Sequence, residues 1–514
     1  MKKSKWCRIL IIVMATVMLG GLAAGCNGDG DADDGRNDIV VLVFEEMISF
    51  DPQASTMVGS QVVNNLIYST LFRADTAGQP QLDFATSFEQ DATGATITFR
   101  DYGRFEDGTP ITAEDIVASI ERGMVQPSTI SQFEGITHVE VINANTIRIH
   151  TDGPLVALRN NLQGQGASIM SKAWLERLEA GLEDWSAPLA SGHYRLDERQ
   201  HGDFARFVPN EYHWSLVNGE DPVMNNSLTI RVVPEAGTRT IMLETGEADL
   251  NMNFLTADYS RVVANDELIL HQNHSNATEY LGFNVTLPPF DNRLVRQAMN
   301  YAIDREAVIA IAIDGFGTPA YTVIPPTTMG HLPRPVDFRF DPDRARELLA
   351  EAGHADGFDV EIFVINDLGE RNAQVIQVFM ADVGIRAEIV RIDPAVRFEM
   401  AATHQQPVFT ARWHGSPEPD INFSRLFAQG GIGGPNQTHY WTPELEEIIA
   451  EAASIFDTEQ RIRLYEEAQR IIMYDSPWVP LYVGRAFALA RADLQGVYVD
   501  MMAGTFLHRL HYID

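Results

Sequence analysis

The sequence predicts an α/β protein. Short segments with the alternation of a β-strand, such as residues 95–100 and 228–233, stand between segments with the apolar spacing of a helix. Several helical segments begin with a capping residue, as Thr112 does before the apolar segment that contains Ile116. Strands that alternate with capped helices along a chain are typical of α/β domains.

The first residues have the layout of a secretory signal. A cationic start at residues 1–5 leads into an apolar run at 9–19, which is shorter than the roughly 20 residues of a membrane span. Residues 22–26, Leu-Ala-Ala-Gly-Cys, resemble a bacterial lipobox. We therefore expect residues 1–25 to be a lipoprotein signal peptide and Cys26 to carry a lipid anchor. An uncleaved N-terminal anchor helix is the alternative.

The residues after the signal predict a flexible tether. Residues 26–38 are rich in Asp and Gly and have no apolar periodicity, so they cannot bury enough surface to fold. The body begins with residues 39–44, Ile-Val-Val-Leu-Val-Phe, a run that is typical of a buried strand.

Composition excludes one class of partner. The chain has 71 acidic residues against 38 Lys and Arg, and a formal net charge of −33 repels nucleic acid. We interpret the acid excess as a solubility feature, with a cationic ligand as the alternative. The two cysteines, Cys7 and Cys26, leave no pair for a disulfide in the exported chain, so its apolar core must stabilise it.

Further caps are predicted along the second half of the chain. Asp341-Pro342 begins a helix that should end at Gly353, and Thr442-Pro443 and Asp457 begin two more. Residues 359–364 have the pattern of a strand between these helices.

One block of sequence identifies a family. In residues 105–116 an Asp-Gly turn, a stiffening proline and the Thr112 cap follow one another. This block resembles the bacterial extracellular solute-binding proteins of family 5, which serve peptide, oligopeptide and nickel ABC transporters. Other blocks agree in the order of that family: residues 50–52, 191–196, 238–249, 281–305 and 461–477.

The resemblance implies a fold and a division into domains. It implies a two-lobed, periplasmic-binding-protein-like fold of type II, from the large cluster with an extra subdomain in lobe I and the ligand at the interlobe cleft. Lobe I would comprise residues 39–255, with the extra subdomain at about 61–187, and lobe II would comprise 256–484. Residues 485–514 would return to lobe I.

The resemblance also implies a function. The chain would be the substrate-binding component of an ABC importer, a monomer that captures a peptide or related small polar solute and delivers it to a permease and ATPase complex. It would be extracytoplasmic and lipid-anchored, on the periplasmic side or the outer face of the membrane. The alternatives are a ligand sensor or chaperone on the same fold, and a binder of sugars, opine-like conjugates or nickel chelates.

We predict that the protein is not an enzyme. Its sequence has no Gly-x-Ser-x-Gly elbow and no His-Glu-x-x-His motif, and the exported chain has no cysteine available as a nucleophile. His271 and His274, like His508 and His511, are three residues apart without a third ligand in a recognisable spacing, so we interpret them as solvated or hydrogen-bonding. We therefore expect neither a metal site nor a cofactor.

The resemblance places the ligand contacts in a lobe I loop and a Trp-containing segment of lobe II. An aromatic face suits an extended polar solute, whereas core packing is the other interpretation of the tryptophan. The expected contacts are Met57, Ser60, Trp413, His414, Ser416, Asp420, Asn436 and Tyr440.

Ser416 departs from the pattern of the related peptide binders. They have an Asp three residues after the Trp, where its carboxylate pairs with the ammonium of the peptide. Glu418 or Asp420 could supply that charge from a shifted register, or Asp420 could cap the helix that follows. For Asn436, stabilisation of a turn is the alternative to ligand contact.

Overall fold

The computed structural model describes residues 37–499, apart from 56, 77 and 255, and residues 506–513. The predicted signal peptide and Cys26 lie outside the described residues. Within the described part of the chain, no helix is both long and apolar enough to cross a membrane.

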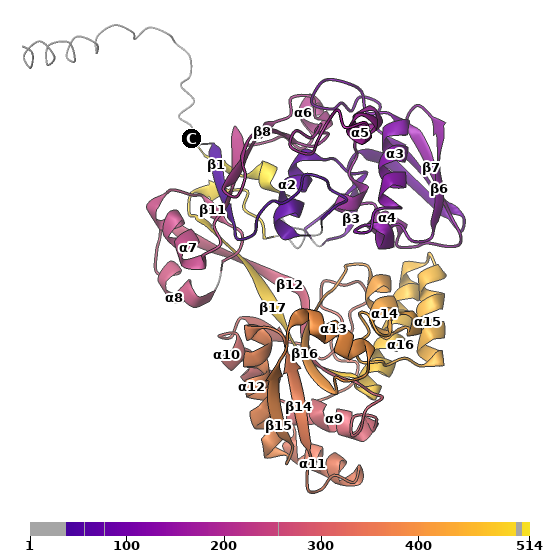
Figure 1. Cartoon of the computed structure of the whole chain (residues 1–514), viewed down its shortest axis with the longest axis vertical. Helices are drawn as coiled ribbons and strands as arrows, with labels where there is room; N and C mark the ends of the chain where they lie inside the picture. The colour runs from indigo at the N-terminus through magenta and orange to yellow at the C-terminus, as the bar shows by residue number, and fades with distance from the viewer. Residues whose placement is uncertain (1–36, 56, 77, 255, 500–505, 514) are drawn as a thin grey trace, which may run out of the picture. The chain divides into compact units, whose positions relative to one another are not determined.

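One long sheet links the two lobes, and its central strands are β12 (Leu268–Phe283) and β17 (Trp478–Arg491), which pair antiparallel (Figure 1). Lobe I continues the sheet with β11 (Leu250–Asn251), β1 (Asp38–Val43), β10 (Ser227–Val232), β9 (Phe204–Pro209) and β8 (Tyr194–Gln200). Lobe II continues it with β16 (Val408–His414), β14 (Asp359–Val364) and β15 (Arg386–Arg391), and β13 (Gly317–Pro319) pairs with β17.

The predicted strand at residues 39–44 is confirmed as β1. It pairs in parallel with β10 and β11 and is buried, as its unbroken apolar sequence requires. Ile39 and Val41 of this strand pack in the lobe I core against Val63 and Ile67 of α2 (Val58–Ile67). This packing anchors α2 on the core, and the predicted lobe I contacts lie at the start of this helix.

An extra subdomain has its own sheet and core within lobe I. The sheet is antiparallel, in the order β4-β5-β7-β6. Its core includes Phe84, Ile97 and Ile116. The elements of this part are β2 (Phe72–Ala74), β3 (Pro80–Leu82), β4 (Ala85–Asp91), β5 (Gly94–Phe99), α3 (Ala113–Gly123), β6 (Ile136–Asn143), β7 (Thr146–Thr151), α4 (Leu158–Asn161) and α5 (Lys172–Glu179).

Lobe II has two cores, one on each side of its strands. The first packs α9, α10 and α12 against the sheet, and the second contains the apolar faces of α14, α15 and α16. Its helices are α9 (Arg293–Ala302), α10 (Arg305–Ala312), α11 (Pro342–Glu351), α12 (Asp367–Asp382), α13 (Pro394–Ala402), α14 (Pro419–Phe427), α15 (Pro443–Ser454) and α16 (Thr458–Asp475). Further helices and strands are α6 (Trp214–Asn218), α7 (Ala236–Thr245), α8 (Tyr259–Val262), β18 (Leu494–Gln495) and β19 (His511–Tyr512), and single 3-10 turns lie at Ile130–Gln132, Gln165–Ala167, Thr256–Asp258, Gln429–Gly431 and Leu507–Arg509.

The predicted helix caps are confirmed. Thr112 and Asp115 form a capping box at α3, in which each side chain accepts a hydrogen bond from the backbone N–H of the other residue. Asp341, Thr442 and Asp457 cap α11, α15 and α16 through their side chains.

Candidate functional site

Trp413 lies near the end of β16, in the part of lobe II that the sequence singled out. Its indole is half-buried against the core that contains Phe423 and Tyr465. Its Nε1 donates a hydrogen bond to Asn422 Oδ1 at 3.0 Å. The ring therefore packs on the core and also presents a fixed apolar surface.

Asn422 organises the loop after Trp413, and sequence reasoning missed it. This side chain is fully buried in α14. Its Oδ1 also accepts from Ser416 N, and its Nδ2 donates to Ser416 O, both at 3.0 Å. The available signal was a polar residue between Ile421 and Phe423, on the buried side of a predicted helix.

Neighbouring segments hold the same loop from the other side. Gly415 N donates to Asn276 O at 2.7 Å, and Thr328 Oγ1 donates to Ser416 O at 2.8 Å. A Cβ on Gly415 would lie 2.9 Å from Pro325 Cδ, so this position requires glycine. The backbone of the loop is thus fixed before any solute arrives.

A cavity lies beside Thr328, the residue that bonds Ser416 O of this loop. It has a volume of about 520 Å³, and Thr328 lines it together with Asn273, His274 and Tyr498. The volume is within the range of about 300–1,000 Å³ that small-molecule sites occupy. The loop that holds Trp413 is therefore connected, through Thr328, to a space large enough for a small solute.

The two acids that follow Ser416 differ in their surroundings. Glu418 forms an ion pair with Arg461, and the two side chains are 12% and 5% exposed. Burial raises the pKa of the Glu418 carboxyl, and Arg461 opposes that rise in its pKa. Glu418 is thus committed to a structural pair and is not available to a ligand ammonium.

Asp420 is the other acid. Its carboxylate is half-buried and accepts a long contact of 3.5 Å from the Tyr465 hydroxyl, and burial raises its pKa. The helix α14 begins at Pro419 after Glu418, whose side chain makes no capping bond. Asp420 therefore lies within the first turn and is not the capping residue.

Asn436 and Tyr440 have partners inside lobe II. Asn436 is buried; its Nδ2 donates to Tyr440 O at 2.8 Å and its Oδ1 accepts from Thr438 Oγ1 at 3.0 Å. The Tyr440 hydroxyl donates to Asp475 Oδ2 at 2.8 Å, and burial raises its pKa. These contacts favour the turn-stabilising interpretation of Asn436 and give Tyr440 a packing role.

The remaining expected contacts fall into two kinds. Met57, the residue before α2, is 38% exposed, and His414 is exposed at the end of β16. Ser60 is fully buried, and its Oγ accepts from Ser49 N at 3.3 Å. Met57 and His414 can therefore meet a solute, whereas Ser60 serves the packing of α2.

The histidine pairs do not act as pairs. His274 Nε2 lies 3.2 Å from Arg485 Nη1. His508 is buried and bonds Asp221 Oδ2 at 3.1 Å, whereas the His511 ring bonds Arg509 O. His274, His508 and His511 thus each have a polar contact within the protein.

Comparison with known proteins decides the family. A family model for "Bacterial extracellular solute-binding proteins, family 5 Middle" matches residues 79–434. The chain belongs to this family. It is 30% identical over 480 residues to the glutathione-binding protein GsiB of Escherichia coli K12, covering 90% of this chain and 92% of that protein.

Solved structures show the same fold. HbpA2 from Haemophilus parasuis is 23% identical with a TM-score of 0.85, and the match covers 93% of this chain and 100% of that one. A dipeptide-binding protein from Pseudoalteromonas, in complex with Met-Leu, is 24% identical with a TM-score of 0.75 over 93% and 100% of the two chains. The predicted two-lobed α/β fold of type II is confirmed.

The family also fixes the general function. Its members are the substrate-binding components of ABC importers and work outside the cytoplasm with a permease and an ATPase. The predictions of solute binding and of ABC transport are confirmed at this level.

Proposed function

We propose that this protein captures a short peptide or a glutathione-like conjugate and delivers it to an ABC permease, without bond chemistry of its own. The observation that carries the proposal is the 30% identity to a glutathione-binding protein over 92% of its length. The Trp413 loop supports it, because a fixed aromatic face beside bonded backbone groups contacts a peptide-like solute without demanding one side chain.

The site would be completed from both lobes. Trp413, His414 and Ser416 would contact the solute from lobe II, with Met57 on lobe I. Asp420 would supply the negative charge for an ammonium group, since Glu418 is paired with Arg461. We take Ser60, Asn436 and Tyr440 as residues that support the walls of the site.

The division into lobes at residues 39–255, 256–484 and 485–514, with the extra subdomain at about 61–187, belongs to the same proposal. Closure would bend the two strands that cross between the lobes. Their register is interrupted between His274 and Thr278 of β12, which offers a place for that bend.

The proposal includes the position of the protein in the cell. After cleavage before Cys26, an acylated N-terminus and the tether at residues 26–38 would hold a monomeric receptor at the outer face of the membrane or on its periplasmic side. Labelling with radioactive palmitate tests this part: wild type should incorporate label and Cys26→Ala should not. Equal labelling of the two would contradict it.

A thermal-shift screen tests the proposed solute class. The protein is heated with dipeptides, longer peptides, reduced glutathione, sugars, opine-like conjugates and nickel chelates. A true solute at about 100 times its dissociation constant should add about 2.7 kcal/mol of stability. We expect shifts with glutathione and short peptides; a shift with sugars or nickel chelates alone would contradict the proposal.

A further inference from the structure

A second cavity lies in lobe I between α2 and the extra subdomain. Its volume is about 230 Å³, which suits a small polar molecule or one end of a larger one. Its walls come from α2, the segment around β2, residues 128–132 and 163–166, and His193. We call it the lobe I cavity.

Among the described residues, five of the side chains that line this cavity each have a buried polar atom without a hydrogen-bond partner. Asp83 and His193 are 4% and 8% exposed, so both are cut off from bulk solvent. Buried polar atoms in folded proteins nearly always have partners, so these atoms call for a partner that the described residues do not supply. The five atoms are Arg73 Nη1, Asp83 Oδ1, Gln163 Oε1, Gln165 Oε1 and His193 Nε2.

The two glutamines are oriented as acceptors. Gln163 Nε2 donates to Asn160 Oδ1 at 2.8 Å, and Gln165 Nε2 donates to Ser55 O at 2.6 Å. Each amide nitrogen is thus used, and each carbonyl oxygen is left over. Together with Asp83 Oδ1, the wall offers three acceptors for a donor-rich group.

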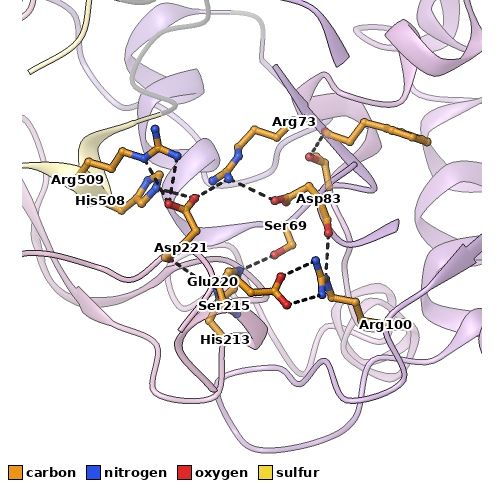
Figure 2. Close-up of polar contacts among 12 residues, drawn as sticks. Ser69, Arg73, Asp83, Arg100, His213, Ser215, Glu220, Asp221, His508 and Arg509 are labelled. Carbon is orange, nitrogen blue, oxygen red and sulfur yellow. Dashed lines mark hydrogen bonds and ion pairs between the residues drawn. The ribbon is translucent and has the colours of Figure 1, made fainter. Parts of the chain in front are cut away.

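Arg73 offers a positively charged hydrogen-bond donor instead of an acceptor. Figure 2 shows its guanidinium between Asp221 and Asp83, with Nη2 at 2.6 Å from Asp221 Oδ2 and 3.7 Å from Asp83 Oδ1. These contacts orient the guanidinium, and its Nη1 has no hydrogen-bond partner among the described residues. An arginine N–H forms strong, charge-assisted hydrogen bonds to a carboxylate.

The charges of the wall select a ligand with both signs. Arg73 and Asp83 are the cation and the anion among the cavity residues, so the wall is close to neutral. A lone anion would face Asp83 and a lone cation would face Arg73. A group that carries an ammonium and a carboxylate on one carbon satisfies both.

A metal ion fits the neighbouring histidines less well. His193, Asp221 and His508 place one ligand atom each within 4.8 Å of the others. However, Arg73 and Arg509 already bind Asp221, and their charges oppose a cation. The His193 and His508 rings are stacked at 4.3 Å with an interplanar angle of 13°, so their lone pairs run side by side and do not converge.

We propose that the lobe I cavity binds the α-amino-acid head group of a small solute. The ammonium would bond Asp83 Oδ1 and the carbonyls of Gln163 and Gln165, and the carboxylate would bond Arg73 Nη1 and His193 Nε2. The head group belongs either to a free amino acid or to a γ-glutamyl conjugate such as glutathione. The site uses lobe I residues alone and does not depend on the proposed transport function.

Calorimetric titration of the purified protein tests the site with two probes, L-glutamine and reduced glutathione. Binding of L-glutamine assigns a free amino acid to the cavity, and binding of glutathione alone assigns a conjugate to it if Asp83→Asn weakens that binding. In both cases the Asp83→Asn variant should bind at least about tenfold more weakly, because a charge-assisted hydrogen bond is lost. N-acetyl-L-glutamine, which lacks the ammonium, and L-glutaminamide, which lacks the carboxylate, should not bind to the cavity.

Two further variants keep the test decisive if Asp83→Asn does not fold. Gln163→Met removes one free acceptor at similar volume and should weaken binding by about fivefold. Val125→Ala, at a position of the same subdomain that is 71% exposed, should bind as wild type does.

Three results would overturn the proposal. They are the absence of binding by both probes, equal binding of the blocked compounds, and unchanged affinity in both Asp83→Asn and Gln163→Met. Stabilisation by Zn²⁺ alone, with neither probe binding, would assign the histidines to a metal. Peptides that still bind in any of these cases would leave the proposed transport function intact, so the two failures are distinguishable.

Discussion

The Trp413 loop of lobe II and the lobe I cavity differ in what has become of their polar atoms. In the loop, Asn422 takes up the indole N–H and both backbone groups of Ser416. In the cavity, Asp83 and His193 each keep a buried atom that has no hydrogen-bond partner among the described residues. A loop whose polar atoms are already hydrogen-bonded offers a solute a fixed surface and an aromatic face, and such a surface tolerates many solutes. Buried polar atoms without a hydrogen bond instead favour a ligand that carries the one matching donor or acceptor group.

Removal of the Glu418–Arg461 ion pair beside the Trp413 loop should have the largest effect on stability. In Glu418→Ala, the guanidinium of Arg461 stays buried without its carboxylate. We expect the free energy of unfolding to fall by about 3–5 kcal/mol, measured by urea denaturation.

Two companion variants sharpen this result. Glu447→Ala removes an exposed acid from α15 and should change stability by less than about 0.5 kcal/mol. The double variant Glu418→Leu with Arg461→Met replaces the pair by apolar groups and should recover much of the loss. A Glu418→Ala protein as stable as wild type would show that the pair does not support the loop.

The second largest expected effect is a loss of stability at low pH, which arises in lobe I. Burial, and the charge of Arg73 after it, lower the pKa of His213 to about 3. Between that value and the ordinary one of about 6.5, the unfolded chain binds the proton and the folded chain does not, so stability is lost as pH falls. From His213 alone we expect a loss of about 2 kcal/mol between pH 7 and 5, measured by denaturant unfolding.

A matched pair of variants separates this effect from general acid sensitivity. His213→Gln should flatten the dependence of stability on pH, whereas Val125→Ala, at a position that is 71% exposed, should leave it unchanged. Identical pH profiles for His213→Gln and wild type would contradict the assignment.

The smallest expected effects lie at the start of α2. Ser60→Ala removes a buried acceptor of Ser49 N and should cost about 1 kcal/mol without changing solute affinity. Met57→Ala should leave stability within about 0.5 kcal/mol and weaken solute binding severalfold. Urea denaturation and calorimetry of both variants check this; the reverse pattern would exchange the roles that we give to the two residues.

Local features could be predicted from the sequence because their partners are close along the chain. The Thr112–Asp115 capping box spans four residues, and β1 follows from one unbroken apolar run. The fold class followed from blocks such as residues 105–116, whose turn and cap are also local.

The other features of the site depend on contacts between residues that are far apart along the chain, and the spacing of residues in the sequence does not reveal such contacts. Glu418 and Arg461 are 43 residues apart, and their pairing removed Glu418 from the candidate ligand contacts. His508 was compared with its sequence neighbour His511, but folding stacks it on His193. The buried atoms of the lobe I cavity that have no hydrogen-bond partner could not be predicted from the sequence either. Such atoms can be recognised only when the positions of all their neighbours are known.

Calorimetric titration of reduced glutathione into wild type and Trp413→Ala tests the central claim most directly. Calorimetry should show glutathione binding by wild type, and at least about tenfold weaker binding by Trp413→Ala, since a buried aromatic anchor typically carries 2 kcal/mol or more of binding energy. Equal affinity of the two proteins for glutathione, or binding of neither glutathione nor any short peptide by wild type, would contradict the account.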